Sequence, residues 1–579
     1  MKKVIYLVFI FAVLSGVFYA CQEKFLDRPP IGGLSEATLA NQKGVDAVLI
    51  GAYSLLDGWA QGWGNGAVWT AAASNWVYGG VCGGDAHKGS DASDQPAINP
   101  IERYECLPSN EYPRGKWRTC YDGVARSNSV LQLLAKATDV SADKAKQIQA
   151  EARFLRGHYH FEAKKVFNNV PYVSDKATDF NVPNDRDIWS DIEADLKFAY
   201  DNLPETQAQV GRVNKWTAGA LLAKAYMFQK KYADAKTLLE NVIANGKTPN
   251  GLKYALNEKF NDNFLIATKN NKESVFSVQS SVNDGADGEN GNYGDVLNFP
   301  YTGGPGTCCG FYQPSFELAN SYRTDANGLP LLDGSFNTGA NQLKTDQNVS
   351  PSDPFTPDAG NIDPRLDRTV GRRGIPYLDW GPHPGASWIR DQGYSGPYAS
   401  IKHVYKKSEQ GSGSTASGWA QGASANNINL IRFSDVILWA AECEVEVGSL
   451  EKARTYVNQI RTRAANPADF VQINGAPAAK YVIDTYKTPW TDKALARKAV
   501  QFERKLELGM EGHRFFDLVR WGTAPEVLNA YIAYESTKLP GLKGARFTAG
   551  KTEYMPVPIQ EIIASTVEGK ATLKQNPGY

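Results

Sequence analysis

The chain has 579 residues, enough for roughly two to four folding units. Hydrophobic residues make up 42 % of it and charged residues 21 %, which excludes a disordered or collagen-like chain. Lys and Arg together number 62, as do Asp and Glu, so no basic excess is available to hold nucleic acid.

Residues 1–20 have the features of a secretory signal peptide. Lys2 and Lys3 precede an uncharged stretch of 17 residues, and Ala20 lies directly before Cys21. A cysteine at the cleavage point is typical of bacterial lipoprotein signals, in which the thiol is acylated. The pattern therefore predicts a mature chain that starts at an acylated Cys21 and is held on the membrane by its lipid. An uncleaved anchor helix is the alternative.

Residues 21–38, which contain Pro and Gly pairs, are predicted to form an extended tether. Over residues 39–270 the apolar spacing predicts a series of helices. The clearest lies at residues 152–167, where apolar side chains repeat on one stripe and charged ones fall largely outside it. Pro171 follows its end, because proline cannot donate to a further helical turn.

Two distant segments are similar to one another. Residues 219–243 and 437–460 each predict a helix, a short turn and a second helix, with alanine where the helices must approach closely. Such pairs are the unit of tetratricopeptide-type superhelices, in which each pair buries its faces against the next. We therefore predict an all-α fold built as a tetratricopeptide-like superhelix of helix pairs, in which the chain folds back to bring the two segments together.

Between these segments the composition changes. Residues 271–428 are rich in Gly, Pro, Asn, Asp and Ser, and a structureless insertion of this length would be unusual in a compact domain. We predict a loop-rich inserted lobe with short helices and strands, seated on the helical scaffold. Residues 429–579 are then a C-terminal helical part that completes the scaffold begun by residues 39–270.

Apart from Cys21, six cysteines are present: Cys82, Cys106, Cys120, Cys308, Cys309 and Cys443. An even number in an exported chain permits disulfides, and the first three could bridge locally, although the connectivity stays open. Cys443 lies in a helical pattern and is predicted to be a buried free thiol. No pair of cysteines has the spacing of a zinc site.

Aromatic residues form three clusters, each interspersed with glycine and other turn residues. The clusters are Trp59, Trp63, Trp69 and Trp76; Tyr293, Phe299, Tyr301, Phe311 and Tyr312; and Tyr377, Trp380, Trp388, Tyr394 and Tyr398. Glycine-rich surroundings predict loops, so we expect some of these rings to face solvent and others to fix the loops to the scaffold.

A sugar that stacks on one ring hides about 60 Å² of apolar surface, worth about 1.5 kcal/mol. Binding therefore needs two or three rings together with amide and carboxylate partners. The residues expected to bind ligand are Trp76 with its neighbour Asn75, Trp380 with its neighbour Asp379, and Tyr293, Tyr301 and Trp388.

The segment 503–521 is dense in charge, with Glu507 one turn before Glu511 and His513 one turn before Asp517. Because apolar residues alternate with these charges at helical spacing, we interpret the segment as a buried ion network that locks helices together. Acid–base catalysis is the alternative, but it needs a cleft with perturbed carboxylates. Nucleophile, phosphate-loop and metalloprotease motifs are absent from the sequence, and we predict that the protein is not an enzyme.

An acidic loop at residues 283–295 contains Asp284, Asp287 and Glu289. Oxygen-rich loops with glycine suit a structural Ca²⁺, although the spacing is not that of an EF-hand. A solvated acidic loop is the alternative, and no other cofactor is predicted.

Four segments together resemble the SusD/RagB family of outer-membrane nutrient-uptake lipoproteins. They are the start at residues 21–30 (CQEKFLDRPP), residues 151–173 (EARFLRGHYHFEAKKVFNNVPYV), residues 503–521 (ERKLELGMEGHRFFDLVRW), and the C-terminus with PVPI at 556–559 and QNPGY at 575–579. They occur in the family's order and span the whole chain.

The resemblance implies a helical scaffold with an extracellular face built from loops, lipid-anchored in the outer membrane at the cell surface. It also implies a partner, a SusC-like TonB-dependent transporter, to which the lipoprotein delivers captured oligosaccharide. Peptide is the other ligand class that the resemblance allows. A tetratricopeptide-type assembly scaffold without a small ligand, and a surface glycoside hydrolase, are the alternatives outside this function.

Overall fold

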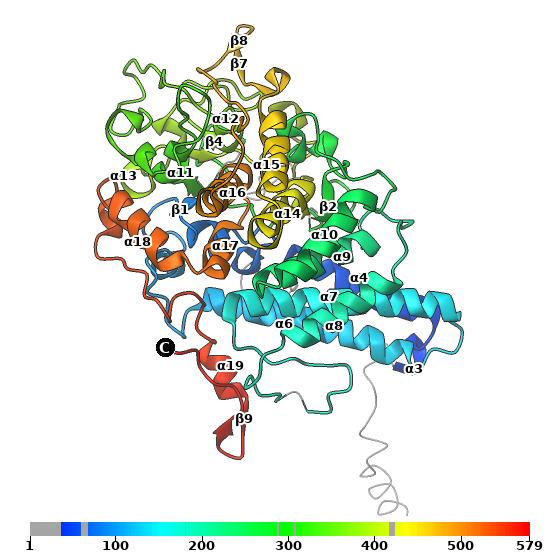
Figure 1. Cartoon of the computed structure of the whole chain (residues 1–579). Coiled ribbons are helices and arrows are strands. Elements are labelled where there is room, and N and C mark those ends of the chain that lie inside the picture. The colour runs from blue at the N-terminus through cyan, green and yellow to red at the C-terminus, as the bar shows by residue number, and fades with distance from the viewer. Residues whose placement is uncertain (1–35, 59–67, 180, 287–288, 306–307, 416–422) are drawn as a thin grey trace, which may run out of the picture.

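The computed structural model describes residues 36–58, 68–179, 181–286, 289–305, 308–415 and 423–579. Its base is a layer of helices that lie side by side in Figure 1, and the short helix at the start of the described chain packs against them. These helices are α3 (Glu36–Leu39), α4 (Gln42–Ser54), α6 (Glu111–Leu134), α7 (Ala142–Phe167) and α8 (Trp189–Asn202).

Helix α7 contains the segment predicted to be helical at residues 152–167, and that prediction is confirmed. The side chain of Ser141 caps its first turn by accepting from the backbone N–H of Lys144. Almost every residue of its second half is buried, because the base layer covers one side of the helix and the rest of the scaffold covers the other. Asn168, with a φ of 57°, ends it.

The two similar segments form helix pairs, and the prediction that they meet is confirmed. The first pair is α9 (Lys215–Phe228) with α10 (Tyr232–Asn245), and the second is α14 (Phe433–Val447) with α15 (Leu450–Ala464). Helix α10 packs against α14, so the chain returns after the lobe and extends the same superhelix, with α16 (Lys493–Leu508) as the next layer. The fold is therefore all-α, as predicted.

The lobe leaves and rejoins the scaffold at one point. Strand β2 (Ser274–Val278) pairs antiparallel with β6 (Ile428–Arg432), which joins the two ends of the lobe. Within it the described elements are short: β3 (Phe311–Pro314), α11 (Phe316–Ser321), α12 (Leu366–Thr369), β4 (Val370–Gly371), α13 (Gln392–Ser395) and β5 (Ala399–Ser400). The lobe has a small apolar core of its own beside the main one.

Two segments from other parts of the chain complete the lobe's contacts. Strand β1 (Ala86–Gly89) pairs with β3 and is followed by α5 (Asn99–Glu102). After α16 come α17 (Arg514–Trp521) and α18 (Ala524–Glu535), and α18 packs on α11.

The remaining elements are a hairpin and a C-terminal arm. The hairpin is β7 (Gln472–Ile473) with β8 (Ala476–Pro477). The arm consists of α19 (Ile559–Ala564), β9 (Thr566–Val567) and β10 (Lys570–Ala571), and it projects from the base in Figure 1.

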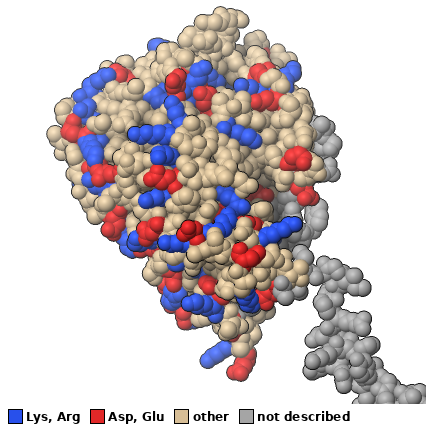
Figure 2. Space-filling view, turned by 90° about the vertical axis from the view of Figure 1, so that its right-hand side faces the viewer, with Lys and Arg blue, Asp and Glu red and all other residues tan. Residues whose placement is uncertain are grey.

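Basic and acidic side chains are interspersed on the face drawn in Figure 2, so that face carries no basic groove of the kind that follows a nucleic-acid backbone. In the described part of the chain, no helix is both long enough and apolar enough to cross a bilayer. The signal peptide, the acylated Cys21 and most of the tether lie outside the described residues and stay predictions.

The cysteines differ in part from expectation. Cys82, Cys106 and Cys120 are buried and unpaired, so the suggestion of a local bridge among them is wrong. Burial raises the pKa of the Cys106 and Cys120 thiols to about 12, which keeps them protonated and unreactive. Cys443 is a buried free thiol, as predicted. The disulfide that does form joins the adjacent residues Cys308 and Cys309.

Candidate functional site

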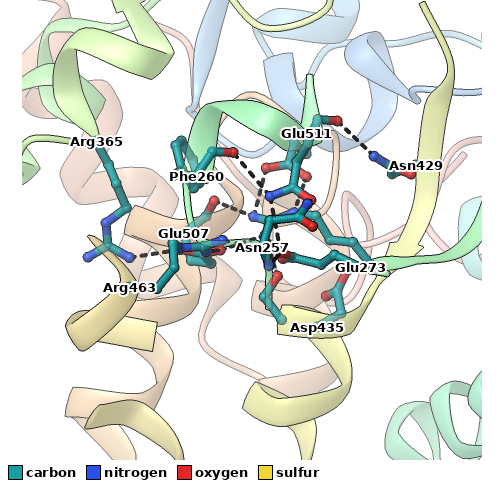
Figure 3. A network of polar contacts seen from close by, with 12 residues as sticks. Asn257, Phe260, Glu273, Arg365, Asn429, Asp435, Arg463, Glu507 and Glu511 are labelled. Atoms are coloured by element: carbon teal, nitrogen blue, oxygen red, sulfur yellow. Dashed lines mark hydrogen bonds and ion pairs between the residues drawn. The ribbon is translucent and has the colours of Figure 1, made fainter. Parts of the chain in front are cut away.

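The charge-dense segment at the end of α16 forms a buried ion network, which confirms the structural interpretation. Arg432 Nη1 lies 3.0 Å from Glu273, its Nε lies 2.8 Å from Glu511, and it also pairs with Glu507. Lys402 Nζ lies 2.6 Å from Glu511. None of these five residues is more than 6 % exposed, and Figure 3 shows Glu273, Glu507 and Glu511 gathered between the helices.

Two carboxyl groups of the charge-dense segment, Glu511 and Asp517, are held ionised and are therefore unsuited to acid catalysis. Burial acts to raise the pKa of Glu511, but the charges of Arg432 and Lys402 outweigh it and lower that pKa to about 2. At Asp517, burial also acts to raise the pKa, but the charges of the neighbouring arginines outweigh it and lower that pKa to about 2. His513 has its pKa lowered to about 4 by burial. Near neutral pH, Glu511 and Asp517 therefore hold fixed charges that lock the helices, whereas His513 is neutral, and none of the three exchanges protons there.

Trp76 and Asn75, expected to bind ligand, are instead core residues. The Trp76 ring is 0 % exposed, packs edge-on against Phe311 at 6.1 Å, and its indole N–H donates to the carbonyl of Gly294 at 3.2 Å. Asn75 is 6 % exposed and its amide donates to Glu162 at 3.2 Å. Both side chains are buried, so the expectation that they form an exposed stacking site is wrong.

The glycines around Trp76 explain the error. A Cβ on Gly79 would lie 1.7 Å from the carbonyl oxygen of Gly512, and one on Gly80 would lie 2.1 Å from the Tyr312 hydroxyl. Here glycine allows a short π-helix, η4 (Trp76–Val81), to press against the break between α16 and α17. A glycine-rich sequence therefore indicated close packing at this place, and not an exposed loop.

The third aromatic cluster mainly builds the lobe. Trp388 is 7 % exposed and belongs to the lobe's own core, so it cannot stack with a ligand as expected. Trp380 is half-buried, and its indole N–H donates to the carbonyl of Tyr405 at 3.0 Å. Asp379 accepts from the backbone N–H groups of residues 407–408 at 2.5 and 3.0 Å, which fixes a turn. Of the two tryptophans, Trp380 is the more exposed.

Tyr293 and Tyr301 are both half-buried. Tyr293 packs against the main core. The backbone N–H of Tyr301 donates to the carbonyl of Trp388 at 2.9 Å, and its ring lies under the guanidinium of Arg390 at 5.2 Å from the ring centroid. Tyr301 thus presents an aromatic ring beside a planar cation at the surface of the lobe.

Arg390 joins the lobe to the segment that follows β1. Its Nη2 lies 2.8 Å from Asp91, and its Nη1 lies 2.7 Å from Asp94 and 2.8 Å from the Ser90 hydroxyl. The side chains of Arg390, Asp91 and Asp94 are 30 %, 26 % and 28 % exposed. These ion-paired groups therefore keep part of their surface in contact with solvent.

The next residue, Gln95, connects this group to the first aromatic cluster. Its side-chain oxygen accepts from the indole N–H of Trp69 at 3.2 Å and from the Tyr112 hydroxyl at 2.7 Å. Trp69 is half-buried. Rings from two clusters are thus connected through the polar run of residues 91–95. We name this group of partly exposed side chains the Tyr301 surface: Trp69, Asp91, Asp94, Gln95, Tyr301 and Arg390.

A buried ammonium group supports this surface from below. Lys88 is 0 % exposed, and its Nζ donates to the backbone carbonyls of Asp91 and Asp94 at 2.6 Å each. The same Nζ lies 5.0 Å from the centroid of the Tyr394 ring. Burial lowers the pKa of Lys88 to about 8. Lys88 therefore fixes the backbone that carries the acidic partners of Arg390.

Sequence reasoning did not select most of this surface. Trp69 belongs to a predicted aromatic cluster but is not among the predicted ligand residues, and neither are Asp91, Asp94, Gln95 and Arg390. The one available signal was the polar run DASDQP at residues 91–96. Its link to Arg390 spans 296 positions of the chain and becomes visible only in the fold.

The acidic loop gives no support to the calcium hypothesis. Asp284 accepts from the Ser281 hydroxyl, from the Asn290 amide at 2.8 Å and from the backbone N–H of Ala286 at 3.1 Å, so both its oxygens are in use. Asp287 lies outside the described residues. Among the residues that the structure describes, no group of three or more His, Cys, Asp or Glu is placed to hold a metal. Calcium binding by Asp284, Asp287 and Glu289 stays a prediction.

Two family models match parts of the chain. The model of the SusD family matches residues 272–579, and a model described as "starch-binding associating with outer membrane" matches residues 65–227. "SusD-like protein P25" of Formosa agariphila is 21 % identical over 99 % of both chains. A "SusD-like protein" of Bacteroides ovatus is 23 % identical over 47 % of this chain and 49 % of its own.

Solved structures share the fold. A "laminarin binding SusD-like protein" superposes with a TM-score of 0.65 at 23 % identity, covering 93 % of this chain and 100 % of its own. "Surface glycan-binding protein A" of Bacteroides thetaiotaomicron, in complex with laminarihexaose, superposes with a TM-score of 0.64 at 20 % identity, covering 93 % and 99 %. Because the SusD family model covers more than half of the chain, the resemblance seen in the sequence is confirmed, and the chain belongs to the SusD/RagB family.

Proposed function

We propose that this protein captures oligosaccharides at the cell surface and passes them to a SusC-like TonB-dependent transporter, while an acylated Cys21 anchors it in the outer membrane. Family membership supports this function, as do the names of two structural neighbours, one laminarin-binding and one in complex with laminarihexaose. The observation that carries the proposal is the Tyr301 surface, where half-exposed rings adjoin planar polar groups.

The chemistry of that surface suits a sugar. A pyranose presents an apolar face, which stacks on an aromatic ring for about 1.5 kcal/mol, and a rim of hydroxyl groups. The Arg390 guanidinium donates hydrogen bonds, and the Asp94 carboxylate and Gln95 amide oxygen accept them. Two rings and three polar groups predict an affinity between micromolar and millimolar, about −8 to −4 kcal/mol, until the transporter adds its own contacts.

Binding without hydrolysis is part of the proposal. A glycosidase needs one carboxylic acid that stays protonated and a second carboxylate across the scissile bond. The two carboxylates of the Tyr301 surface, Asp91 and Asp94, are both ion-paired with Arg390. Hydrogen bonds from Ser93 lower the pKa of Asp91, so that carboxylate remains ionised near neutral pH. Asp91 is therefore unsuited to protonate a leaving group.

One experiment separates this function from its alternatives. The purified mature chain is titrated calorimetrically with a panel of oligosaccharides that includes laminarihexaose, and with a panel of peptides, while product formation is followed by chromatography. We expect binding of at least one oligosaccharide without any product. A glycoside hydrolase would release shorter sugars, a peptide-binding member would respond to the second panel, and an assembly scaffold would bind neither.

A further inference from the structure

The disulfide between Cys308 and Cys309 directly precedes Gly310, which contacts Tyr301 and the Ser90 partner of Arg390. Both cysteines precede Gly310, and the other four cysteines in the described part of the chain are unpaired. Cys308 is half-buried and Cys309 is 4 % exposed, so Cys308 is the more accessible of the two residues to a small thiol. A disulfide at this position has no evident role in closing the scaffold, since it joins neighbours in the sequence and not distant elements.

Gly310 contacts both halves of the surface. Its N–H donates to the carbonyl of Phe299 at 3.0 Å, and its own carbonyl accepts from the N–H of Ser90 at 2.6 Å. The Ser90 hydroxyl in turn accepts from Arg390 at 2.8 Å. A Cβ on Gly310 would lie 3.2 Å from the Cβ of Tyr301, so the two backbones run side by side. The residue after the disulfide therefore supports both the aromatic ring and the cation above it.

A bond between the sulfurs of adjacent residues closes a small covalent ring that includes the peptide unit between them. The ring removes backbone freedom at the point where the chain enters Gly310, and opening the ring restores that freedom. Because Gly310 holds Ser90 and adjoins Tyr301, added freedom there is transmitted to the two groups that would contact a sugar.

We propose that the Cys308–Cys309 disulfide is a redox-sensitive positioning element of the ligand surface. When it is oxidised, Gly310 keeps Tyr301 and Arg390 in place; when a small dithiol reduces it, this support is lost and ligand binding weakens. The inference about affinity rests on the proposed function, because it assumes that the ligand binds at the Tyr301 surface. The inference that the disulfide orders the backbone at Gly310 does not rest on it.

The reduction is ordinary thiol–disulfide exchange. A thiolate of the dithiol attacks the Cys308 sulfur, the S–S bond breaks, and Cys309 leaves as a thiolate that takes up a proton. The second thiol of the reductant then attacks the mixed disulfide, which releases Cys308 as a thiol. Two electrons pass from the dithiol to the protein, and the dithiol becomes a cyclic disulfide.

The first arm of the test needs no ligand. The native chain is treated with iodoacetamide before and after dithiothreitol, and intact mass counts the alkylated cysteines. Hydrogen–deuterium exchange is then measured in peptides covering residues 297–311. We expect two alkylations only after reduction, and exchange in these peptides faster by about tenfold, the factor that corresponds to lost ordering of about one backbone residue. Alkylation of both cysteines without reductant, or unchanged exchange after reduction, would overturn the proposal.

The second arm measures affinity for laminarihexaose with and without dithiothreitol. We expect about tenfold weaker binding after reduction. The double variant Cys308→Ser/Cys309→Ser is the control: it should bind weakly in both conditions and should not respond to the reductant. Equal affinity of the oxidised and reduced chains would overturn the proposed effect on binding. If the oxidised chain does not bind laminarihexaose at all, that ligand is wrong for the proposed function, and the exchange measurement alone decides whether the disulfide holds the loop.

Discussion

The buried ion network around Arg432 and the exposed Tyr301 surface use the same chemistry for different ends. Both pair an arginine with two or more carboxylates at 2.7–3.0 Å. Arg432 and its partners are at most 6 % exposed, whereas Arg390 and its two partners are 26–30 % exposed. The difference shows that burial, and not the density of charged residues, decides whether such a group locks the fold or is available to a ligand.

The two arrangements also differ in how much stability is lost when one partner of an ion pair is removed. Removing one partner of a buried pair leaves an uncompensated charge inside the protein and costs about 3–5 kcal/mol. Removing one partner of an exposed pair costs about 0–1 kcal/mol, because water replaces the lost contact. A substitution in the network should therefore change folding, and one in the Tyr301 surface should change binding.

The largest expected effect is on stability at the network. Glu511→Ala removes a carboxylate that pairs with Arg432 at 2.8 Å and with Lys402 at 2.6 Å. The substitution should lower the free energy of unfolding by about 3–5 kcal/mol. Urea denaturation measures this loss, and Glu105→Ala, at an exposed ion pair, is the control with little expected change. A Glu511→Ala chain as stable as the wild type would show that the network does not lock the helices.

A comparable loss is expected at Trp76, where the sequence suggested a ligand contact. Its ring is fully buried against Phe311 and Tyr312, so Trp76→Ala should cost about 3–5 kcal/mol through lost burial and the cavity left behind. Thermal denaturation followed by circular dichroism tests this. Retained stability together with lost sugar binding would return Trp76 to the ligand site and contradict its assignment to the core.

A third prediction concerns pH and the buried imidazole of His87 on β1. Both ring nitrogens of His87 lie 2.9 Å from carboxylates, Glu102 on one side and Glu535 on the other. Burial acts to lower the pKa of His87, but the hydrogen bonds and charges of the two glutamates outweigh it and raise that pKa from 6.5 to about 9. The folded chain therefore holds the imidazolium near neutral pH.

Because this folded-state pKa is raised, the stability it contributes is fully present below pH 6.5 and is lost as the pH rises through about 9. The loss should reach about 3 kcal/mol in total, since each pKa unit corresponds to about 1.4 kcal/mol. Unfolding free energies measured from pH 6 to pH 10 test it, with His87→Gln as a variant that lacks this dependence. A wild-type chain equally stable across the range would show that His87 is not held as a cation.

The smallest expected effect on folding is at Arg390. Arg390→Gln removes a half-exposed partner of Asp91 and Asp94, so the free energy of unfolding should change by no more than about 1 kcal/mol. Sugar binding should weaken, because a donor of several hydrogen bonds next to Tyr301 is lost. Calorimetric titration beside thermal denaturation separates the two effects. Strong destabilisation would place Arg390 with the buried network and not with the ligand surface.

The helical scaffold could be predicted because its signals are local. The repeat of apolar residues in α7, and the likeness of the α9–α10 and α14–α15 pairs, follow from spacing within one or two helices. The ion network was also predictable in kind, since Glu507 and Glu511 alternate with apolar residues along the segment, although α16 ends at Leu508 and Glu511 lies in the turn that follows it. Its partner Arg432 was not predictable, because it comes from a strand 75 positions earlier.

The candidate site could be predicted only in part, because its signals are ambiguous or distant. Glycines beside Trp76 suit either an exposed loop or close backbone packing, and the choice depends on Gly512, which lies far away in the sequence. Tyr301 was selected for its aromatic cluster. Its neighbour Arg390 could not be selected, because its partners Asp91 and Asp94 are brought to it by the fold from another element.

The most direct test of the account is the affinity of the chain with Tyr301→Ala for its best oligosaccharide. Calorimetry on the wild type and on this variant, with Tyr226→Ala as a half-exposed control on α9, measures the contribution of the ring. By analogy with stacking of bases on aromatic rings, we predict a loss of about 1–3 kcal/mol in binding at an unchanged melting temperature. Equal affinity of wild type and Tyr301→Ala would contradict the assignment of sugar binding to the Tyr301 surface.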